Sequence, residues 1–175
     1  MKLKIFNQLE RYFQTNEDPN ELRSIINCLY PLGLKLFQRT NYPYHFTASG
    51  WVINKERSHS LLIFHKKLRK WIQPGGHADG QINLSIVALT EVKQETGICS
   101  LRLINNHIFD FDINPIPAYK NIPAHFHLDV RYLIEADMKE PIIASMETYN
   151  VKWFSLNQLA EDVMDEGVIR MTLKL

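Results

Sequence analysis

Two carboxylates follow a glycine pair at a spacing that suits metal chemistry. Residues 75–80 are Gly-Gly-His-Ala-Asp-Gly, and residues 90–98 are Thr-Glu-Val-Lys-Gln-Glu-Thr-Gly-Ile. Glu91 and Glu95 are four residues apart, so a helix would place both on one face, with Gln94 on the same side. Carboxylate and carbonyl oxygens are the ligands that Mg²⁺ prefers in proteins. The segment therefore indicates a site for a hard cation, or else an ordinary solvated helix face.

A turn and a short helix must position these side chains. The strand-forming pair Trp71-Ile72 leads into the glycine turn. Asn83 is a suitable N-cap, and Gly97 suits the position after the helix, where φ is often positive. The apolar face expected for this helix consists of Leu84, Val87, Ala88 and Val92.

The turn and helix together resemble the Nudix box, whose pattern is G-x5-E-x7-R-E-U-x-E-E-x-G-U, with U a bulky aliphatic residue. Six positions match the pattern: Gly76, Glu91, Val92, Glu95, Gly97 and Ile98. Three positions depart from it, because Ile82, Thr90 and Gln94 stand where the family has Glu, Arg and Glu. A strict search for the motif would miss this chain.

The resemblance extends over roughly residues 41–160. The segments that carry it occur in the order expected for one Nudix branch: 46–50, 65–67, 71–77, 127–132 and 151–156. An ordered set is more specific than any one short motif. The resemblance implies an α/β fold, a Nudix-type α/β/α sandwich with a mixed sheet. We expect an N-terminal helical extension over residues 1–40 and a Nudix-like domain over residues 41–175.

The Nudix resemblance also implies an enzyme, a pyrophosphohydrolase of the acid anhydride hydrolase class. It would cleave the pyrophosphate bond of a nucleoside diphosphate linked to another moiety. Glu91 and Glu95 would bind Mg²⁺ or Mn²⁺, and Gln94 would assist catalysis with them. Glu147, six residues before Trp153, stands where the family often has a further acidic ligand. The alternative is a catalytically impaired Nudix-fold nucleotide-binding module, which the three departures favour.

Seven residues are candidates for substrate binding: Gly75, Gly76, His77, Lys67, Arg69, Asp129 and Tyr119. The glycines let the backbone turn tightly and approach a ligand. The basic segment 65–70 would steer phosphates, although a solvated turn is the simpler interpretation. Tyr119 lies in the proline-rich loop 114–120, which we expect to form a wall of the cleft. Asp129 would line the cleft or hydrogen-bond within the sheet.

Two further groups of residues have alternative interpretations. Ile82 and Thr90 are about two helical turns apart and can approach each other. The family's Glu and Arg at these positions can form a pair, and replacing both with uncharged residues would be nearly neutral for stability. His125, His127 and Asp129 alternate on one strand and could bind zinc. This zinc site is a third alternative, and a less favoured one, because three ligands on one straight strand do not converge easily on a small ion.

The rest of the chain predicts helices followed by strands. Ile5, Leu9, Tyr12 and Phe13 recur at helical spacing, and Asp18-Pro19 would begin a second helix. A hairpin is expected from two apolar runs joined by the polar segment 54–60. The expected strands cover residues 51–53, 61–64, 104–111, 125–134 and 151–154, and Ser155 would cap a final helix over residues 156–164.

Composition limits the classes of partner. The chain has 175 residues, a net charge of +1 and two cysteines without metal-type spacing. This charge balance gives no electrostatic reason to expect nucleic acid or a membrane as partner, and no apolar run approaches the roughly 20 residues of a membrane helix. We expect a cytoplasmic protein with a small nucleotide or pyrophosphate substrate, buried free thiols at Cys28 and Cys99, and a homodimer by family resemblance. The sequence does not identify the substrate.

Overall fold

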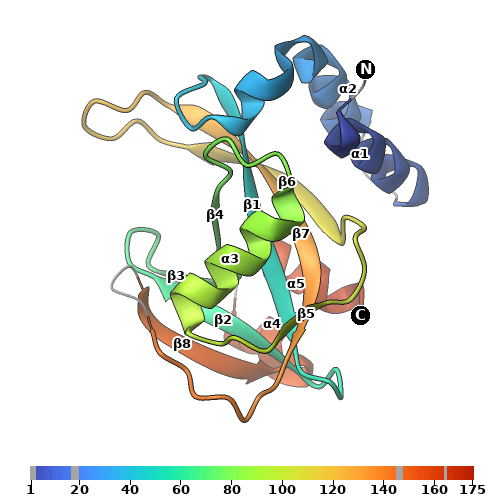
Figure 1. The fold of residues 1–175 in the computed structure, drawn as a ribbon. Helices are drawn as coiled ribbons and strands as arrows, with labels where there is room; N and C mark the ends of the chain where they lie inside the picture. The colour runs from blue at the N-terminus through green and yellow to red at the C-terminus, as the bar shows by residue number, and fades with distance from the viewer. Residues whose placement is uncertain (1–2, 17–19, 145–147, 164) are drawn as a thin grey trace.

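A mixed β-sheet lies between two layers of helices in the computed structural model, which describes residues 3–16, 20–144, 148–163 and 165–175 (Figure 1). Over these residues the helices are α1 (Lys4–Thr15), α2 (Asn20–Leu29), the 3₁₀ segment η1 (Tyr30–Phe37), α3 (Leu84–Thr96), α4 (Leu156–Asp162) and α5 (Glu166–Leu173). The strands are β1 (Tyr44–Ile53), β2 (His59–His65), β3 (Lys70–Ile72), β4 (Gly75–His77), β5 (Leu101–Leu103), β6 (Asp110–Ile116), β7 (His125–Ala136) and β8 (Thr148–Ser155).

Strand β1 is the centre of the sheet. It pairs in parallel with β7 along its whole length, from Tyr44 with Phe126 to Ile53 with Glu135. On its other side it pairs antiparallel with β4 in its middle, at residues 47–49, and with β2 at its end. Strands β5 and β6 pair with β7, whereas β3 and β8 pair with β2. The parallel β1–β7 pair therefore brings residues 44–53 beside residues 126–135.

Two hydrophobic cores lie on opposite faces of this sheet. Successive side chains of a strand point to opposite faces. Phe46, Ala48 and Val52 of β1 belong to one core, together with the buried face of α3 and residues of α1, α2 and η1. Trp51 and Ile53 belong to the other core, which contains residues of α4 and α5. The predicted α/β/α sandwich with a mixed sheet is confirmed.

The N-terminal helices share the core on the α3 side. Ile5, Phe6, Leu9 and Tyr12 of α1 are buried there, and the ring of Phe6 contacts the ring of Phe46 in an edge arrangement, with centroids 6.3 Å apart. The predicted start of the second helix, Asp18-Pro19, lies outside the described residues. The division of the chain at residue 40 stays a prediction.

The elements around the glycine turn agree with the sequence pattern. The expected hairpin is formed by β1 and β2, and β3 contains Trp71-Ile72. Helix α3 begins after Asn83 and ends at Gly97, whose φ of 76° is in the left-handed region. Asn83 nevertheless caps no backbone N–H of the helix with its side chain, and its Oδ1 accepts a hydrogen bond from the Ser85 hydroxyl instead.

Three expectations about the remaining chain are wrong. Most of the strand expected over residues 104–111 is absent, because these residues lie largely between β5, which ends at Leu103, and β6, which begins at Asp110. Helix α5 was not expected at all, and α4 ends at Asp162, before the expected position. Cys28 and Cys99 are free, as expected, but both are exposed.

Candidate functional site

The two carboxylates of α3 lie against the glycine turn. The backbone N–H of Gly75 donates a hydrogen bond of 2.9 Å to Oε2 of Glu95, whose residue is only 7% exposed. A Cβ atom at Gly76 would lie 2.5–2.6 Å from the carboxylate atoms of Glu91. Only glycine therefore leaves room for Glu91 in this arrangement. The structure brings Glu91 and Glu95 close to Gly75 and Gly76; the four-residue spacing had predicted only that the two carboxylates share a helix face.

The three residues that depart from the box pattern all lie on the surface. Ile82 is 58% exposed in the loop before α3, and Thr90 and Gln94 are exposed on α3. Uncharged residues at positions 82 and 90 therefore leave no buried charge without a partner. Gln94 lies on the helix that carries the two carboxylates, but its side chain faces solvent rather than the buried position that Glu95 occupies.

Other predicted site residues lie elsewhere on the surface. Lys67 and Arg69 belong to the exposed turn between β2 and β3, where the guanidinium of Arg69 lies 5.8 Å from the ring centre of Tyr149. Tyr119 is 60% exposed in the loop between β6 and β7. Glu147, the expected additional metal ligand, lies outside the described residues. These positions stay predictions.

Asp129 is buried within the sheet. Its carboxylate accepts hydrogen bonds from the hydroxyls of Thr47 and Ser49, from the Gln73 amide and from Nε of Arg131, which is 2.8 Å away. These donors come from the neighbouring strand β1, from the segment after β3 and from β7 itself. Of the two roles expected for Asp129, the structure shows hydrogen bonding within the sheet.

The Arg131 guanidinium links Asp129 to a second buried carboxylate, Asp110. Asp110 is fully buried and lies 2.7 Å from Arg131, Arg170 and Lys174. Burial alone would raise the pKa of Asp110. Hydrogen bonds from Arg170 and Lys174 and the charge of Arg131 outweigh burial and lower the pKa to about 2. The network fixes β6, β7 and α5 to one another and contains none of the carboxylates of α3.

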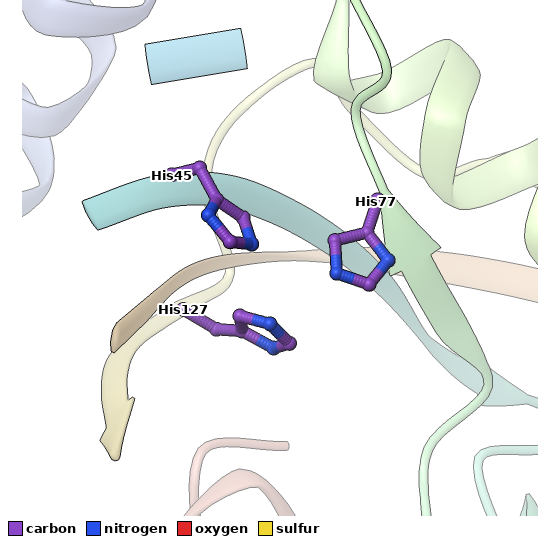
Figure 2. A group of neighbouring side chains, drawn as sticks. All are labelled: His45, His77 and His127. Atoms are coloured by element: carbon purple, nitrogen blue, oxygen red, sulfur yellow. The ribbon is translucent and has the colours of Figure 1, made fainter. Parts of the chain in front are cut away.

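Four histidines gather next to this network, on the same face of the sheet. Nitrogen atoms of His45, His77 and His127 all lie within 4.8 Å of one another, and Figure 2 shows the three rings converging from β1, β4 and β7. Nε2 of His125 lies 3.2 Å from Nε2 of His127. The zinc site expected from His125, His127 and Asp129 is therefore corrected. His127 groups with His45 and His77, whereas the Asp129 carboxylate already accepts hydrogen bonds from hydroxyl, amide and guanidinium donors.

Burial keeps the imidazoles of His45, His77 and His127 neutral. Desolvation, assisted by the charge of Arg39, lowers the pKa of His77 to about 4. Desolvation and the neighbouring histidines lower the pKa of His127 to about 3, and burial also lowers the pKa of His45. At neutral pH each ring therefore offers a nitrogen lone pair rather than a second N–H.

His45 is the member that the sequence pattern did not reveal. It is adjacent to the segment 46–50 and lies on β1 at a position that alternates with Thr47 and Ser49. The sequence alone hardly indicates that His45 belongs to the cluster, because only the parallel pairing of β1 with β7 places His45 beside His127. A cavity of about 600 Å³ is lined by α1 and residues 106–108 and contains no predicted site residue.

The family model of the NUDIX domain matches residues 43–174. The chain belongs to this family. The match covers the glycine turn, α3 and all the strands, and it supports the prediction of a Nudix pyrophosphohydrolase. Within the described residues no helix is long and apolar enough to cross a membrane.

Individual relatives agree with this assignment. A probable DHNTP pyrophosphohydrolase from Lactococcus lactis subsp. cremoris is 26% identical over 135 residues, which are 75% of this chain and 78% of that protein. A NUDIX family hydrolase from Clostridium perfringens superposes with a TM-score of 0.59 at 19% identity, over 74% of this chain and 95% of the other. The C. elegans Ap4A hydrolase superposes with a TM-score of 0.58 at 17% identity, over 74% and 93% of the two chains. At these identities the structural likeness shows the fold.

Proposed function

We propose that this Nudix protein is a hydrolase that uses Mg²⁺ or Mn²⁺ to cleave the pyrophosphate bond of a nucleoside diphosphate linked to another moiety. The observation that carries the proposal is the placement of Glu91 and Glu95 against Gly75 and Gly76. A pyrophosphate carries several negative charges, so its cleavage requires charge neutralisation and an activated water. A bound divalent cation supplies both.

The donor set fits a hard cation. Glu91 and Glu95 offer oxygen ligands one helical turn apart, and Mg²⁺ is usually bound by one or two carboxylates together with substrate phosphates. Glu95 is held in place by the Gly75 N–H, so its orientation is fixed before any ion binds. We assign Gln94 and Glu147 supporting roles. Gln94 offers a carbonyl oxygen without charge, which predicts weaker metal binding than a Glu at that position would give.

The substrate is best sought among triphosphates and dinucleotides. The L. lactis relative is named as a probable DHNTP pyrophosphohydrolase, and a structural relative is an Ap4A hydrolase. Both names describe molecules in which a phosphoanhydride bond joins two groups. We therefore propose a panel of DHNTP, nucleoside triphosphates, Ap4A and sugar nucleotides, each tested with Mg²⁺ and with Mn²⁺.

The deciding experiment compares three proteins on this panel. The wild-type chain, the Glu91→Gln/Glu95→Gln double variant and the Glu161→Gln control are assayed for release of nucleotide, phosphate or pyrophosphate. Glu161 is exposed on α4, so its substitution repeats one Glu→Gln exchange away from the glycine turn. We expect metal-dependent release from the wild type and the control, and its loss in the double variant. Equal turnover by all three proteins would contradict the proposal.

The alternative, a catalytically impaired nucleotide-binding module, has a distinct outcome. No compound would be turned over, whereas one would raise the melting temperature of the wild-type protein. In that case Gln94→Glu would test whether the missing carboxylate is the cause, because this substitution restores the box pattern at an exposed position. A cytoplasmic location and a homodimer stay predictions, and light scattering would measure the oligomeric state.

A further inference from the structure

The histidines on the opposite face of the sheet form a second potential metal site. His45, His77 and His127 belong to three different strands, and no two of them are close in sequence. Their ring centres are 5.3 Å (His45 to His77), 5.0 Å (His45 to His127) and 4.9 Å (His77 to His127) apart. Three ligands from three strands converge on one point, which three ligands along one strand do not.

A hydrogen bond orients the ring of His45. Nδ1 of His45 lies 3.2 Å from the Asn41 carbonyl, so Nδ1 carries the proton and Nε2 keeps its lone pair. His45 is only 1% exposed, and among the described residues no group hydrogen-bonds to its Nε2. A buried nitrogen without a partner is unfavourable unless a ligand occupies it. Backbone carbonyls that accept from the second ring nitrogen are the usual support of metal-binding histidines.

His125 orients the ring of His127. Its Nδ1 lies 2.8 Å from the Pro123 carbonyl, to which it donates, so its Nε2 is an acceptor. The 3.2 Å contact between the two Nε2 atoms then requires His127 to donate. This leaves Nδ1 of His127 as the atom with a lone pair. His125 is therefore a positioning residue in this arrangement.

We propose that His45, His77 and His127 bind one Zn²⁺ ion. Neutral imidazole nitrogens are common ligands of zinc, and three protein ligands leave a fourth tetrahedral position for water or a substrate oxygen. The three rings are neutral at physiological pH, so a cation meets no charge on them. The nearby Arg39 forms an ion pair with Asp79, which offsets its positive charge.

This site is distinct from the carboxylate pair of α3. Gly76 pairs with Ala48 and faces Glu91, whereas the next residue, His77, pairs with Thr47 and faces the opposite way. Strand alternation therefore separates the two groups of ligands by the thickness of one strand. One group offers only oxygen and the other only nitrogen, so the zinc proposal does not depend on the proposed hydrolase function.

Metal analysis of the purified chain tests the proposal. The protein is treated with a chelator and dialysed, then titrated with Zn²⁺ alone, and separately with Co²⁺, whose visible spectrum reports nitrogen ligation and geometry. We expect one tightly bound Zn²⁺ per chain, and this zinc should stay bound in a large excess of Mg²⁺. Failure of the folded wild-type protein to bind stoichiometric zinc would overturn the proposal.

Variants locate the ion. His45→Gln, His77→Gln and His127→Gln are each expected to weaken zinc binding by at least about 100-fold, since loss of an outer-shell partner alone costs about 10–100-fold. His107→Gln is the matched control, because His107 is exposed and outside the cluster. The Glu91→Gln/Glu95→Gln variant should keep its zinc. Zinc that survives in all three histidine variants, or disappears in the Glu double variant, would place the ion elsewhere and overturn the proposal. Circular dichroism checks that each variant is folded.

Discussion

The two faces of strand β4 carry different chemistry and depend on different levels of structure. On the α3 face, Glu91 and Glu95 come from one helix and meet a turn that is nearby in sequence. On the other face, His45, His77 and His127 come from three strands, and two of these strands are distant in sequence. Local spacing therefore determines the carboxylate pair, whereas sheet topology determines the histidine cluster. The following experiments test this separation.

The greatest loss is expected from single changes on the α3 face. Glu91→Gln or Glu95→Gln should lower kcat/KM by about 10²–10⁴-fold, the range for removing a group that acts in the transition state. The amide oxygen introduced by Glu95→Gln could still accept the Gly75 N–H, so the melting temperature should change little. Steady-state kinetics with the preferred substrate measures the effect, and an unchanged kcat/KM would remove the carboxylates from the mechanism.

On the opposite face, Asp110→Asn should mainly affect stability. Removing one partner of a buried ion pair costs about 3–5 kcal/mol, because the remaining charges stay buried. Here Arg131, Arg170 and Lys174 would lose their shared carboxylate. Urea unfolding measures the change, with Asp137→Asn on the surface as the control. A loss as small as that of the control would show that the network contributes little.

The two glycines of the turn should respond differently to alanine. At Gly76 the added Cβ meets the flexible end of Glu91, so Gly76→Ala should lower kcat/KM by about 10²-fold through misplacement. At Gly75 it meets Cβ and Cα of Ser49 at 2.3 and 2.7 Å and the Ala48 carbonyl oxygen at 2.8 Å, so Gly75→Ala should destabilise the fold by about 1–3 kcal/mol. Parallel kinetics and urea unfolding separate the effects, and identical behaviour of the two variants would contradict the arrangement.

The pH dependence of stability should reveal Asp110 in the acid range. Its folded pKa of about 2 is below the ordinary value of 3.8, so the stabilisation is fully present above about pH 4. This contribution to the free energy of unfolding amounts to roughly 2 kcal/mol, and it is lost as the pH falls toward about 2. Unfolding measured across this range should show a shallower slope for Asp110→Asn. If the free energy of unfolding of the wild type and of Asp110→Asn fell equally with pH, Asp110 would not be the source of the acid sensitivity.

The smallest effect is expected from restoring the box at its surface positions. Ile82→Glu/Thr90→Arg changes two exposed residues, so the free energy of unfolding should change by no more than about 0.5 kcal/mol. Urea unfolding of this double variant tests the claim. A gain of several kcal/mol would mean that the two positions interact far more strongly than their exposure indicates.

The sequence predicted the parts of the fold that depend on local rules. Asn83 and Gly97 delimited α3, and the polar segment 54–60 predicted the first hairpin. Helix α5 was missed because it is short, with only eight residues and a glycine in its first turn. The strand expected over residues 104–111 was misplaced, because apolar content does not show where pairing with β7 changes from β5 to β6.

The candidate site divides in the same way. Helical spacing was enough to place Glu91 and Glu95 together. His45 could not be assigned, because its neighbour His127 is known only once β1 and β7 are paired in parallel register. The misjudged exposure of Cys28 and Cys99 has a similar origin, since burial of a single thiol depends on packing that composition does not specify.

Strand β4 makes the length of the turn as important as its composition. Its three residues pair one by one with Ser49, Ala48 and Thr47. A slip of one residue would reverse the direction of every side chain in the strand. His77 would then point at the carboxylates of α3, and the histidine cluster would lose a member. A single-residue insertion or deletion after Pro74 would therefore disable both sites at once, although it would remove none of their ligands.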